Sequence, residues 1–380
     1  MQTDDLIYLD HNATTPLLPE VVDAMLPYLR EHFGNPSSGH LFGQRAHRAV
    51  EEAREQVAQL IGCEADEVIF TSGGTEANNL AIRGVIEAAG GAGEVVTSSV
   101  EHPATAQPCA WLEQRGTTVT RLGVDATGRV REDEAARAIT DATTLVTVMH
   151  SNNETGTLQP IAAISQAARA AGALVHTDAA QSLGKVPVNV QQLGVDLLSC
   201  AGHKLYAPKG VGALYIRRGT PIAPFTLGAG HERGLRPGTE NVASIVGLGQ
   251  AALAARRDLD EVAERMRYLR DLLWSRLSAA IPNLALNGHP ELRLPNTLNV
   301  RFPGVTGDAV LAGAPEVAAS TGSACDAGQT SASAVILAMG IPAEQAVGAL
   351  RLSLGRDSDE TQMLRAAHAL IESWTQAVGA

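Results

Sequence analysis

Short apolar runs alternate with longer amphipathic segments through roughly the first half of the chain. The runs are rich in Val, Leu and Ile, as buried strands are, and cover residues 67–70, 95–98, 145–149, 173–177, 197–200 and 212–216. Before and between them, apolar positions recur with helical spacing while charged positions fill the other face, most clearly in residues 46–61, ahead of the first run. Strands that alternate with helices favour a mostly parallel sheet covered by helices. The pattern therefore predicts an α/β fold.

The C-terminal third has a different pattern. Helical spacing extends from about residue 242 to 281, and two alternating segments, 297–302 and 349–354, are typical of half-buried strands. Residues 357–360 resemble a capping box that begins a last helix towards Ala377. Because a chain of 380 residues is long for one hydrophobic core, we expect a second, smaller α+β domain. The expected division is a large domain of residues 16–250 and a small domain of residues 1–15 and 251–380.

Composition and charge narrow the classes of partner. Hydrophobic residues make up 45% of the chain and the formal net charge is -12, which disfavours nucleic acid and anionic membranes because both bind clustered positive charge. The N-terminus lacks the apolar core of a signal peptide, and no apolar run is long enough to span a bilayer. Four cysteines are scattered without C-x-x-C spacing, which indicates a reducing compartment and a cytoplasmic protein.

Polar or titratable residues directly follow most of the predicted strands. In a mostly parallel sheet the carboxyl ends of the strands meet at one edge, where ligands bind. Each residue alone has an ordinary structural explanation, as a helix cap, a turn residue or a buried histidine, but their common position favours a binding site. The residues are Thr75, His102, Asn153, Asp178 with Gln181, and His203 with Lys204.

Lys204 has the most specific chemistry in this set. Only three lysines occur in the chain, Lys185, Lys204 and Lys209, and a lysine amine, unlike an arginine, can lose its proton and form a Schiff base with a carbonyl. Residues 71–79 form a Gly-rich turn before a helix, which suits a phosphate but matches neither a dinucleotide nor an ATP motif. A phosphate cradle, a stacking ring, a carboxylate and an amine together fit pyridoxal phosphate (PLP).

Two further loops have the composition of functional segments. Residues 226–241 are rich in glycine and contain Arg233 and Arg236. Residues 318–333 are small and polar, with Cys325 in their middle. A cysteine is usually buried and inert, but the only apolar neighbours of Cys325 in the sequence are alanines, which favours a reactive thiol.

Taken together, these motifs resemble those of the cysteine desulfurases, in the aminotransferase class V group of fold-type-I PLP enzymes. The resemblance covers nearly the whole chain and implies a large domain with a mostly parallel seven-stranded sheet. The Gly-Ser-Ala-Cys form resembles the subgroup that supplies sulfur for iron–sulfur assembly and tRNA thiolation. The matching segments are residues 8–16, 34–38, 70–76, 101–102, 152–154, 176–181, 202–204, 231–233, 236–239, 322–325 and 351–356.

The resemblance implies how the cofactor ring is bound. Lys204 forms the covalent link to PLP and later moves the Cα proton of the substrate. His102 stacks on the ring and assists proton transfer, and Asp178 pairs with the ring nitrogen and keeps it protonated. Asn153 and Gln181 lie at or near the phenolic oxygen of the ring.

The phosphate group has its own set of residues by the same resemblance. Gly74, Thr75 and His203 hold the phosphate within one subunit. Thr239 reaches the phosphate of the partner subunit, which implies a homodimer with composite sites.

The resemblance also implies the substrate chemistry. Arg351 binds the α-carboxylate of L-cysteine in a bidentate pair, and the thiolate of Cys325 attacks the sulfur of the bound substrate. The products are L-alanine and a persulfide on Cys325, whose sulfur passes to an acceptor or iron–sulfur scaffold protein. No metal site is expected, and the sequence leaves open whether an iron–sulfur cluster binds Cys325 transiently.

Some positions depart from the family pattern. Ala201 stands where many relatives have a Ser or Thr that binds the phosphate, so one hydrogen bond worth ~1 kcal/mol is missing unless Ser199 or a water molecule substitutes for it. Asp326 follows Cys325 directly and should raise the pKa of its thiol. Residues 312–316 are short for the family, which indicates a trimmed small domain, and His11 replaces the Tyr of several relatives. None of these changes removes a reacting group.

Three other functions compete with this interpretation. Selenocysteine lyases have the same scaffold and the same cofactor residues, and a PLP β-lyase or aminotransferase of this fold would not need Cys325. A catalytically silent partner of a sulfur relay should have lost Lys204, Asp178 or Cys325, and all three are present. The sequence does not define the sulfur acceptor, the pathway or the preference between cysteine and selenocysteine.

Overall fold

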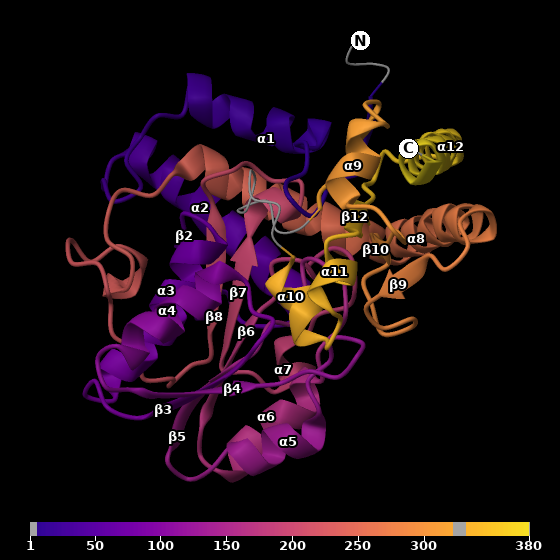
Figure 1. Cartoon of the computed structure of the whole chain (residues 1–380). Coiled ribbons are helices and arrows are strands. Elements are labelled where there is room, and N and C mark those ends of the chain that lie inside the picture. The colour runs from indigo at the N-terminus through magenta and orange to yellow at the C-terminus, as the bar shows by residue number, and fades with distance from the viewer. Residues whose placement is uncertain (1–5, 322–331, 380) are drawn as a thin grey trace.

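A seven-stranded sheet lies at the centre of the computed structural model, which describes residues 6–321 and 332–379 (Figure 1). Its strands are β2 (Val68–Thr71), β3 (Glu94–Ser98), β4 (Thr118–Leu122), β5 (Thr143–Thr147), β6 (Leu174–Asp178), β7 (Leu197–Ala201) and β8 (Gly212–Ile216). Their order is β2-β8-β7-β6-β5-β3-β4, and every neighbouring pair is parallel except those of β8, which runs antiparallel to β2 and β7. The predicted α/β fold with a mostly parallel seven-stranded sheet is confirmed.

β4 is the one strand of this sheet that the apolar pattern does not reveal. It lies at the edge of the sheet beside β3, where Thr118, Thr120 and Arg121 are exposed and Leu122 is buried. An edge strand with mostly exposed side chains has no apolar run, so hydrophobic periodicity does not detect it.

Helices cover both faces of the sheet. Side chains alternate across each strand, so Val95 and Leu145 pack against one layer of helices while Val96 and Val146 pack against the other. The first layer contains α3 (Gly74–Ala88) and α4 (Pro103–Glu113), and the second contains α2 (Leu41–Ile61), α6 (Ile161–Ala170), α7 (Val190–Leu193) and the start of α8 (Val242–Ala280). α1 (Pro19–Arg30) packs on α8, and α5 (Glu132–Ala138) packs on α6. Among the described residues, no helix is long and apolar enough to cross a bilayer.

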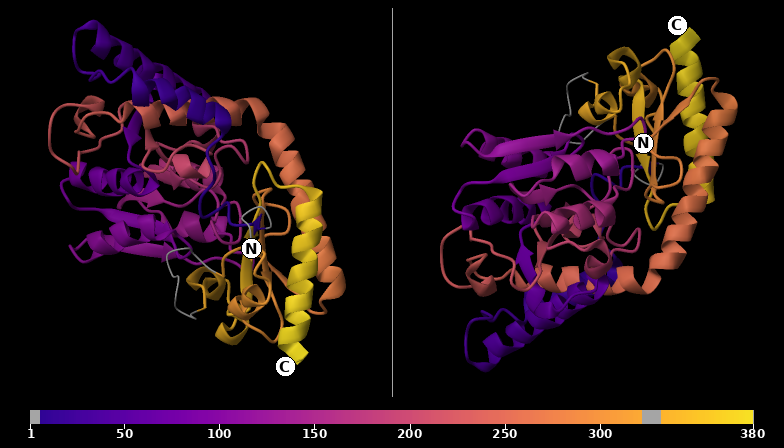
Figure 2. Two further views of the ribbon diagram at one scale, coloured as in Figure 1. Left: turned by 90° about the horizontal axis from the view of Figure 1, so that it is seen from above. Right: turned by 90° about the horizontal axis from the view of Figure 1, so that it is seen from below.

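The C-terminal part has its own antiparallel sheet, with strand order β12-β10-β9. α8 is 39 residues long and continues from the large sheet into this part, where it lies beside the last helix, α12 (Figure 2). The predicted boundary at residue 250 lies within α8, and the division into two domains stays a prediction. The elements are β9 (Ala285–Asn287), β10 (Thr297–Arg301), α9 (Gly307–Ala312), β11 (Val317–Ala318), α10 (Ala334–Ala338), α11 (Ala343–Ala346), β12 (Ala349–Ser353) and α12 (Glu360–Gly379).

The capping box of α12 lies two residues later than the sequence pattern indicates. The Asp359 carboxylate accepts from the backbone N–H of Gln362 at 2.8 Å, and the Gln362 side chain accepts from the backbone N–H of Asp359 at 3.2 Å. Because the first helical residue is Glu360, Asp359 is the residue in position to cap it.

The N-terminal segment connects the two sheets. β1 (Ile7–Tyr8) pairs with β11, and Asp10 forms a parallel bridge with Ser353 of β12. A few residues later the backbone N–H of Thr15 donates to the carbonyl of His203, just after β7. Residues 9–15 therefore lie between the three-stranded sheet and the carboxyl ends of the large sheet.

Candidate active site

A cavity of about 280 Å³ lies at the carboxyl ends of the central strands, against the N-terminal segment. It brings together most of the predicted site residues, from segments far apart in the sequence. Thr239 does not line it and is exposed in the loop after β8, while Cys325 lies outside the described residues. The predicted residues in its wall are Gly74, Thr75, His102, Asn153, Asp178, Gln181, His203, Lys204 and Arg351.

The amine of Lys204 is held at the cavity by the N-terminal segment. Lys204 ends a short 3₁₀ turn, Gly202–Lys204, directly after β7. Its Nζ donates to the backbone carbonyls of Asn12, at 2.5 Å, and Ala13, at 2.7 Å. These carbonyls are neutral acceptors, so the amine is oriented without a carboxylate as its partner in these two bonds.

Asp178 is a buried carboxylate with two fixed donors. It is the last residue of β6, and its Oδ1 accepts from the backbone N–H of Ala180 at 2.9 Å. Its Oδ2 accepts from the side chain of Asn78, on α3, at 2.7 Å. The Oδ1 atom of Asn78 is itself buried without a hydrogen-bond partner among the described residues. Sequence analysis missed Asn78, although it lies within the Gly-rich turn and helix start of residues 71–79.

His102 has a defined tautomer. It is the N-cap residue of α4, and its Nδ1 accepts from the backbone N–H of Ala104 at 3.0 Å, which places the proton of the neutral ring on Nε2. Burial lowers the pKa of His102, and the charge of Lys204 lowers it further, while Asp178 acts in the opposite direction. The ring is therefore neutral at physiological pH and has one nitrogen that can donate.

His203 is also neutral. Burial, followed by the nearby charge of Lys204, lowers its pKa to about 4. Its Nδ1 lies 3.2 Å from the hydroxyl of Thr14 in the N-terminal segment. A neutral His203 can contribute a hydrogen bond to an anion in the cavity but no positive charge.

The start of α3 provides backbone donors for an anion. Gly73, the N-cap residue, has a φ of 150°, which favours glycine. Gly74 and Thr75 begin the helix, whose first N–H groups have no partner within the helix. Ala201 lies close by, since a Cβ on Gly74 would approach the Ala201 Cβ to 3.2 Å.

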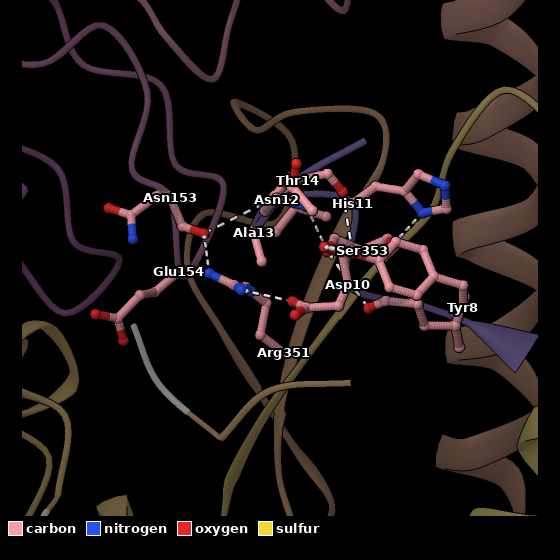
Figure 3. A network of polar contacts seen from close by, with 12 residues as sticks. Tyr8, Asp10, His11, Asn12, Ala13, Thr14, Asn153, Glu154, Arg351 and Ser353 are labelled. Atoms are coloured by element: carbon pink, nitrogen blue, oxygen red, sulfur yellow. Dashed lines mark hydrogen bonds and ion pairs between the residues drawn. The ribbon is translucent and has the colours of Figure 1, made fainter. Parts of the chain in front are cut away.

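Arg351 lies in the cavity wall, and both terminal nitrogens of its guanidinium are already paired with other residues of the chain (Figure 3). The side chain is 2% exposed. Its Nη1 donates to the carbonyl of Asn153 at 3.1 Å, and its Nη2 forms an ion pair with Asp10 at 2.7 Å. Nε is buried and has no partner among the described residues. Sequence analysis did not identify Asp10, although it lies within a motif, residues 8–16, that was recognised.

Lys185 is a buried amine near the site and was also missed. Its Nζ donates to the side-chain oxygen of Gln181 at 3.0 Å and lies 3.5 Å from the side-chain oxygen of Asn12. Burial lowers its pKa to about 7, and the charges of Lys204 and Arg351 add to the effect. The sequence did contain a signal for it: lysine is rare in this chain, and one of the three lysines lies four residues after the predicted site residue Gln181.

Glu101 supports the residue that follows it, His102. Both carboxylate oxygens of Glu101 accept from the backbone N–H of Met149, at 3.0 and 3.1 Å, and the hydroxyl of Ser98 donates to it at 2.5 Å. Burial raises its pKa to about 8. These bonds join the ends of β3 and β5 and so fix the start of α4, where His102 lies.

Comparison with known proteins agrees with this arrangement. The family profile described as "Aminotransferase class-V" matches residues 7–365. The chain is 47% identical to a cysteine desulfurase of Gluconacetobacter diazotrophicus, covering 94% of this chain and 91% of the relative. It is also 47% identical to the cysteine desulfurase IscS of Dictyoglomus turgidum, covering 92% of this chain and 89% of the relative. Among solved structures, a NifS-like protein superimposes with a TM-score of 0.90 at 36% identity, covering 97% of this chain and 98% of that one.

Proposed function

This chain belongs to the aminotransferase class V family, and we propose that its cavity removes sulfur from L-cysteine. The protein is a PLP-dependent enzyme with the activity of a cysteine desulfurase. The products are L-alanine and sulfur bound to Cys325, which passes to an acceptor protein for iron–sulfur assembly or tRNA thiolation. The observation that carries the proposal is the convergence of Lys204, Asp178 and His102 on one cavity.

The residues present fit PLP. Asp178 is a buried carboxylate that Asn78 and a backbone N–H hold in place, as a partner for a pyridinium nitrogen requires. The start of α3 supplies N–H donors for the phosphate, and Lys204 supplies the amine for the covalent link. When bound, PLP acts as an electron sink that stabilises negative charge at the Cα of the substrate.

His102 and Lys204 are placed to handle protons. The neutral His102 ring lines the cavity, and its Nδ1 already accepts from the backbone of α4. Nε2 is therefore the ring nitrogen left to exchange a proton with a ligand. Lys204, held by two carbonyls, would be the amine that moves the Cα proton of the substrate. Gln181 and Asn153 complete the polar wall around the ring, and Arg351 receives the α-carboxylate of the substrate.

Cys325 is the sulfur acceptor in this proposal. In the described part of the chain the other three cysteines, Cys63, Cys109 and Cys200, have thiol pKa values that burial raises to about 12, so they stay protonated and inert. Cys325 is five residues from Ser320, and five residues of fully extended chain reach at most ~18 Å. Ser320 forms an antiparallel bridge with Arg351 in the cavity wall, which supports a reach from Cys325 to the substrate.

On the C-terminal side of Cys325, the described chain also resumes beside the site. The hydroxyl of Ser333 donates to the Glu154 carboxylate at 2.5 Å, and Glu154 follows Asn153 directly.

Attack by the Cys325 thiolate forms a sulfur–sulfur bond as the Cβ–sulfur bond of the substrate breaks. The carbon skeleton keeps the electron pair of that bond, takes up a proton at Cβ, regains a proton at Cα and leaves as L-alanine.

We further propose that the protein is a cytoplasmic homodimer. Phe33, in the connection between α1 and α2, stacks on Phe42 at the start of α2 with ring centroids 5.6 Å apart, although the two are 80% and 55% exposed. Leu29 near the end of α1 and Leu41 at the start of α2 are each 64% exposed. An exposed apolar cluster of this kind is typical of an interface. Thr239 is exposed and does not line the cavity of its own chain, which supports its predicted contact with the phosphate bound by the partner.

The test is a product analysis of the PLP-loaded protein with L-cysteine and a reductant. The proposal predicts L-alanine and sulfide in equal amounts. Pyruvate and ammonia would instead indicate a β-lyase. A parallel assay with L-selenocysteine decides the remaining alternative, because a selenocysteine lyase would release selenide and leave L-cysteine unchanged.

A further inference from the structure

Asp10 and Arg351 form an ion pair across 341 positions of sequence, at the wall of the cavity. The Asp10 carboxylate takes one terminal nitrogen of the guanidinium and the Asn153 carbonyl takes the other (Figure 3). Arg351 is nine-tenths or more buried, and its Nε is left without a partner among the described residues. A buried donor without a partner is costly, and because Arg351 lines the cavity, a carboxylate bound there is a group that could pair with Nε.

The backbone around Asp10 is fixed on both sides. Its carbonyl accepts from the Tyr8 hydroxyl at 3.1 Å and from the backbone N–H of Ala13 at 2.9 Å. The same residue bridges to Ser353 in β12, the strand that carries Arg351. The carboxylate therefore meets Arg351 from a neighbouring segment that is itself held in place, and it restrains the guanidinium through Nη2.

Charge gives this contact a second consequence. An isolated Arg351 would present a full positive charge to an incoming carboxylate, whereas the ion pair with Asp10 is close to neutral overall. The cavity then attracts an anion less strongly but receives it in a fixed orientation.

We propose that Asp10 is a positioning residue for recognition of the substrate α-carboxylate. It holds Arg351 so that the Nε–H, unpaired among the described residues, can donate to the carboxylate, and its negative charge lowers the affinity of the cavity for that carboxylate. This inference rests on the proposed function, in which Arg351 binds the α-carboxylate of an amino acid.

Two variants separate the charge of Asp10 from its role as hydrogen-bond acceptor. Asp10→Asn keeps an oxygen that accepts from Arg351 but removes the negative charge, and Asp10→Ala removes both. The probe is L-alanine, whose binding to the PLP-loaded protein is followed by the change in visible absorption. Ethylamine, which is alanine without its carboxylate, is the matched control ligand.

Asp10→Asn should lower the apparent Kd of L-alanine about fivefold and leave that of ethylamine unchanged, because only the carboxylate senses the removed charge. With L-cysteine the same variant should lower KM while kcat stays within about twofold of wild type. Asp10→Ala should lower kcat about tenfold, because Arg351 is then free to hold the carboxylate in unproductive orientations.

Equal Kd values of L-alanine in wild type and Asp10→Asn would overturn the proposal, as would a parallel change for ethylamine. Both ligand titrations are independent of sulfur chemistry. They therefore test Asp10 even if the product analysis rejects desulfuration. If wild type desulfurates normally and Asp10→Asn has the same Kd of L-alanine as wild type, only the role of Asp10 is rejected.

Discussion

Lys185 donates a hydrogen bond to Gln181 at 3.0 Å in the interior of the protein, behind the wall of the cavity that contains Lys204. Lys185 is 4% exposed. Two of the three lysines of this chain thus meet at Asn12, Lys204 on its backbone oxygen and Lys185 close to its side-chain oxygen.

This buried amine should make the stability of the protein depend on pH. The pKa of Lys185 is lowered to about 7 in the folded state, whereas an unfolded lysine titrates near ~10.4. Between these values the unfolded state binds more protons, so the contribution of Lys185 to the free energy of unfolding rises with pH. Lys185→Met removes this contribution. The free energy of unfolding of the variant, relative to wild type, should fall by about 4 kcal/mol as pH rises from about 7 to about 10.

Urea unfolding of the two proteins at both pH values measures this change. Lys209→Met is the control, because it removes a lysine that is exposed and leaves the buried amine of Lys185 in place. A difference between Lys185→Met and wild type that stays constant across this pH range would show that Lys185 keeps an ordinary pKa.

Asn78 should contribute to cofactor binding without touching the cofactor. Asn78→Leu removes the donor that holds Asp178 at 2.7 Å and leaves a carboxylate oxygen without that partner. We expect the Kd of PLP to rise about tenfold, the effect of losing one charge-assisted hydrogen bond. Asn79→Leu is the matched control, since the Asn79 side chain donates to the backbone of Thr75 instead. Equal PLP affinity in Asn78→Leu and Asn79→Leu would contradict the role given to Asn78.

His102 combines a structural and a chemical role that two substitutions can separate. Its Nδ1 caps α4, and asparagine is a good N-cap residue, so His102→Asn should keep the stability of the protein. His102→Ala should cost about 1 kcal/mol of stability through the lost cap. Both variants lose the ring, so both should lose desulfuration by at least about a hundredfold. Thermal unfolding tests the expected stabilities, and the rate of alanine formation tests the expected loss of activity. Normal turnover in His102→Asn would show that His102 acts only as the N-cap of α4.

The fold and much of the cavity could be predicted because their signals are local. Each buried strand is a short apolar run, and residues such as Asp178 and Lys204 come at or just after the end of one, so the shared edge of the sheet brings them together. The contacts that orient these groups are not local. Asn78 is separated by 100 positions from Asp178, and Asp10 by 341 from Arg351, so no periodicity connects them. Lys185 shows the same limit, since its burial depends on how the N-terminal segment folds over the site.

The central claim is that Cys325 receives the sulfur, and the most direct measurement compares Cys325→Ala with wild type. Both proteins are loaded with PLP and given L-cysteine and a reductant, and alanine and sulfide are quantified. Cys63→Ala is the control, because burial raises the pKa of the Cys63 thiol to about 12. We predict that Cys325→Ala keeps the visible absorption of bound PLP and loses alanine and sulfide formation, while Cys63→Ala keeps both. Full desulfuration by Cys325→Ala would contradict the account.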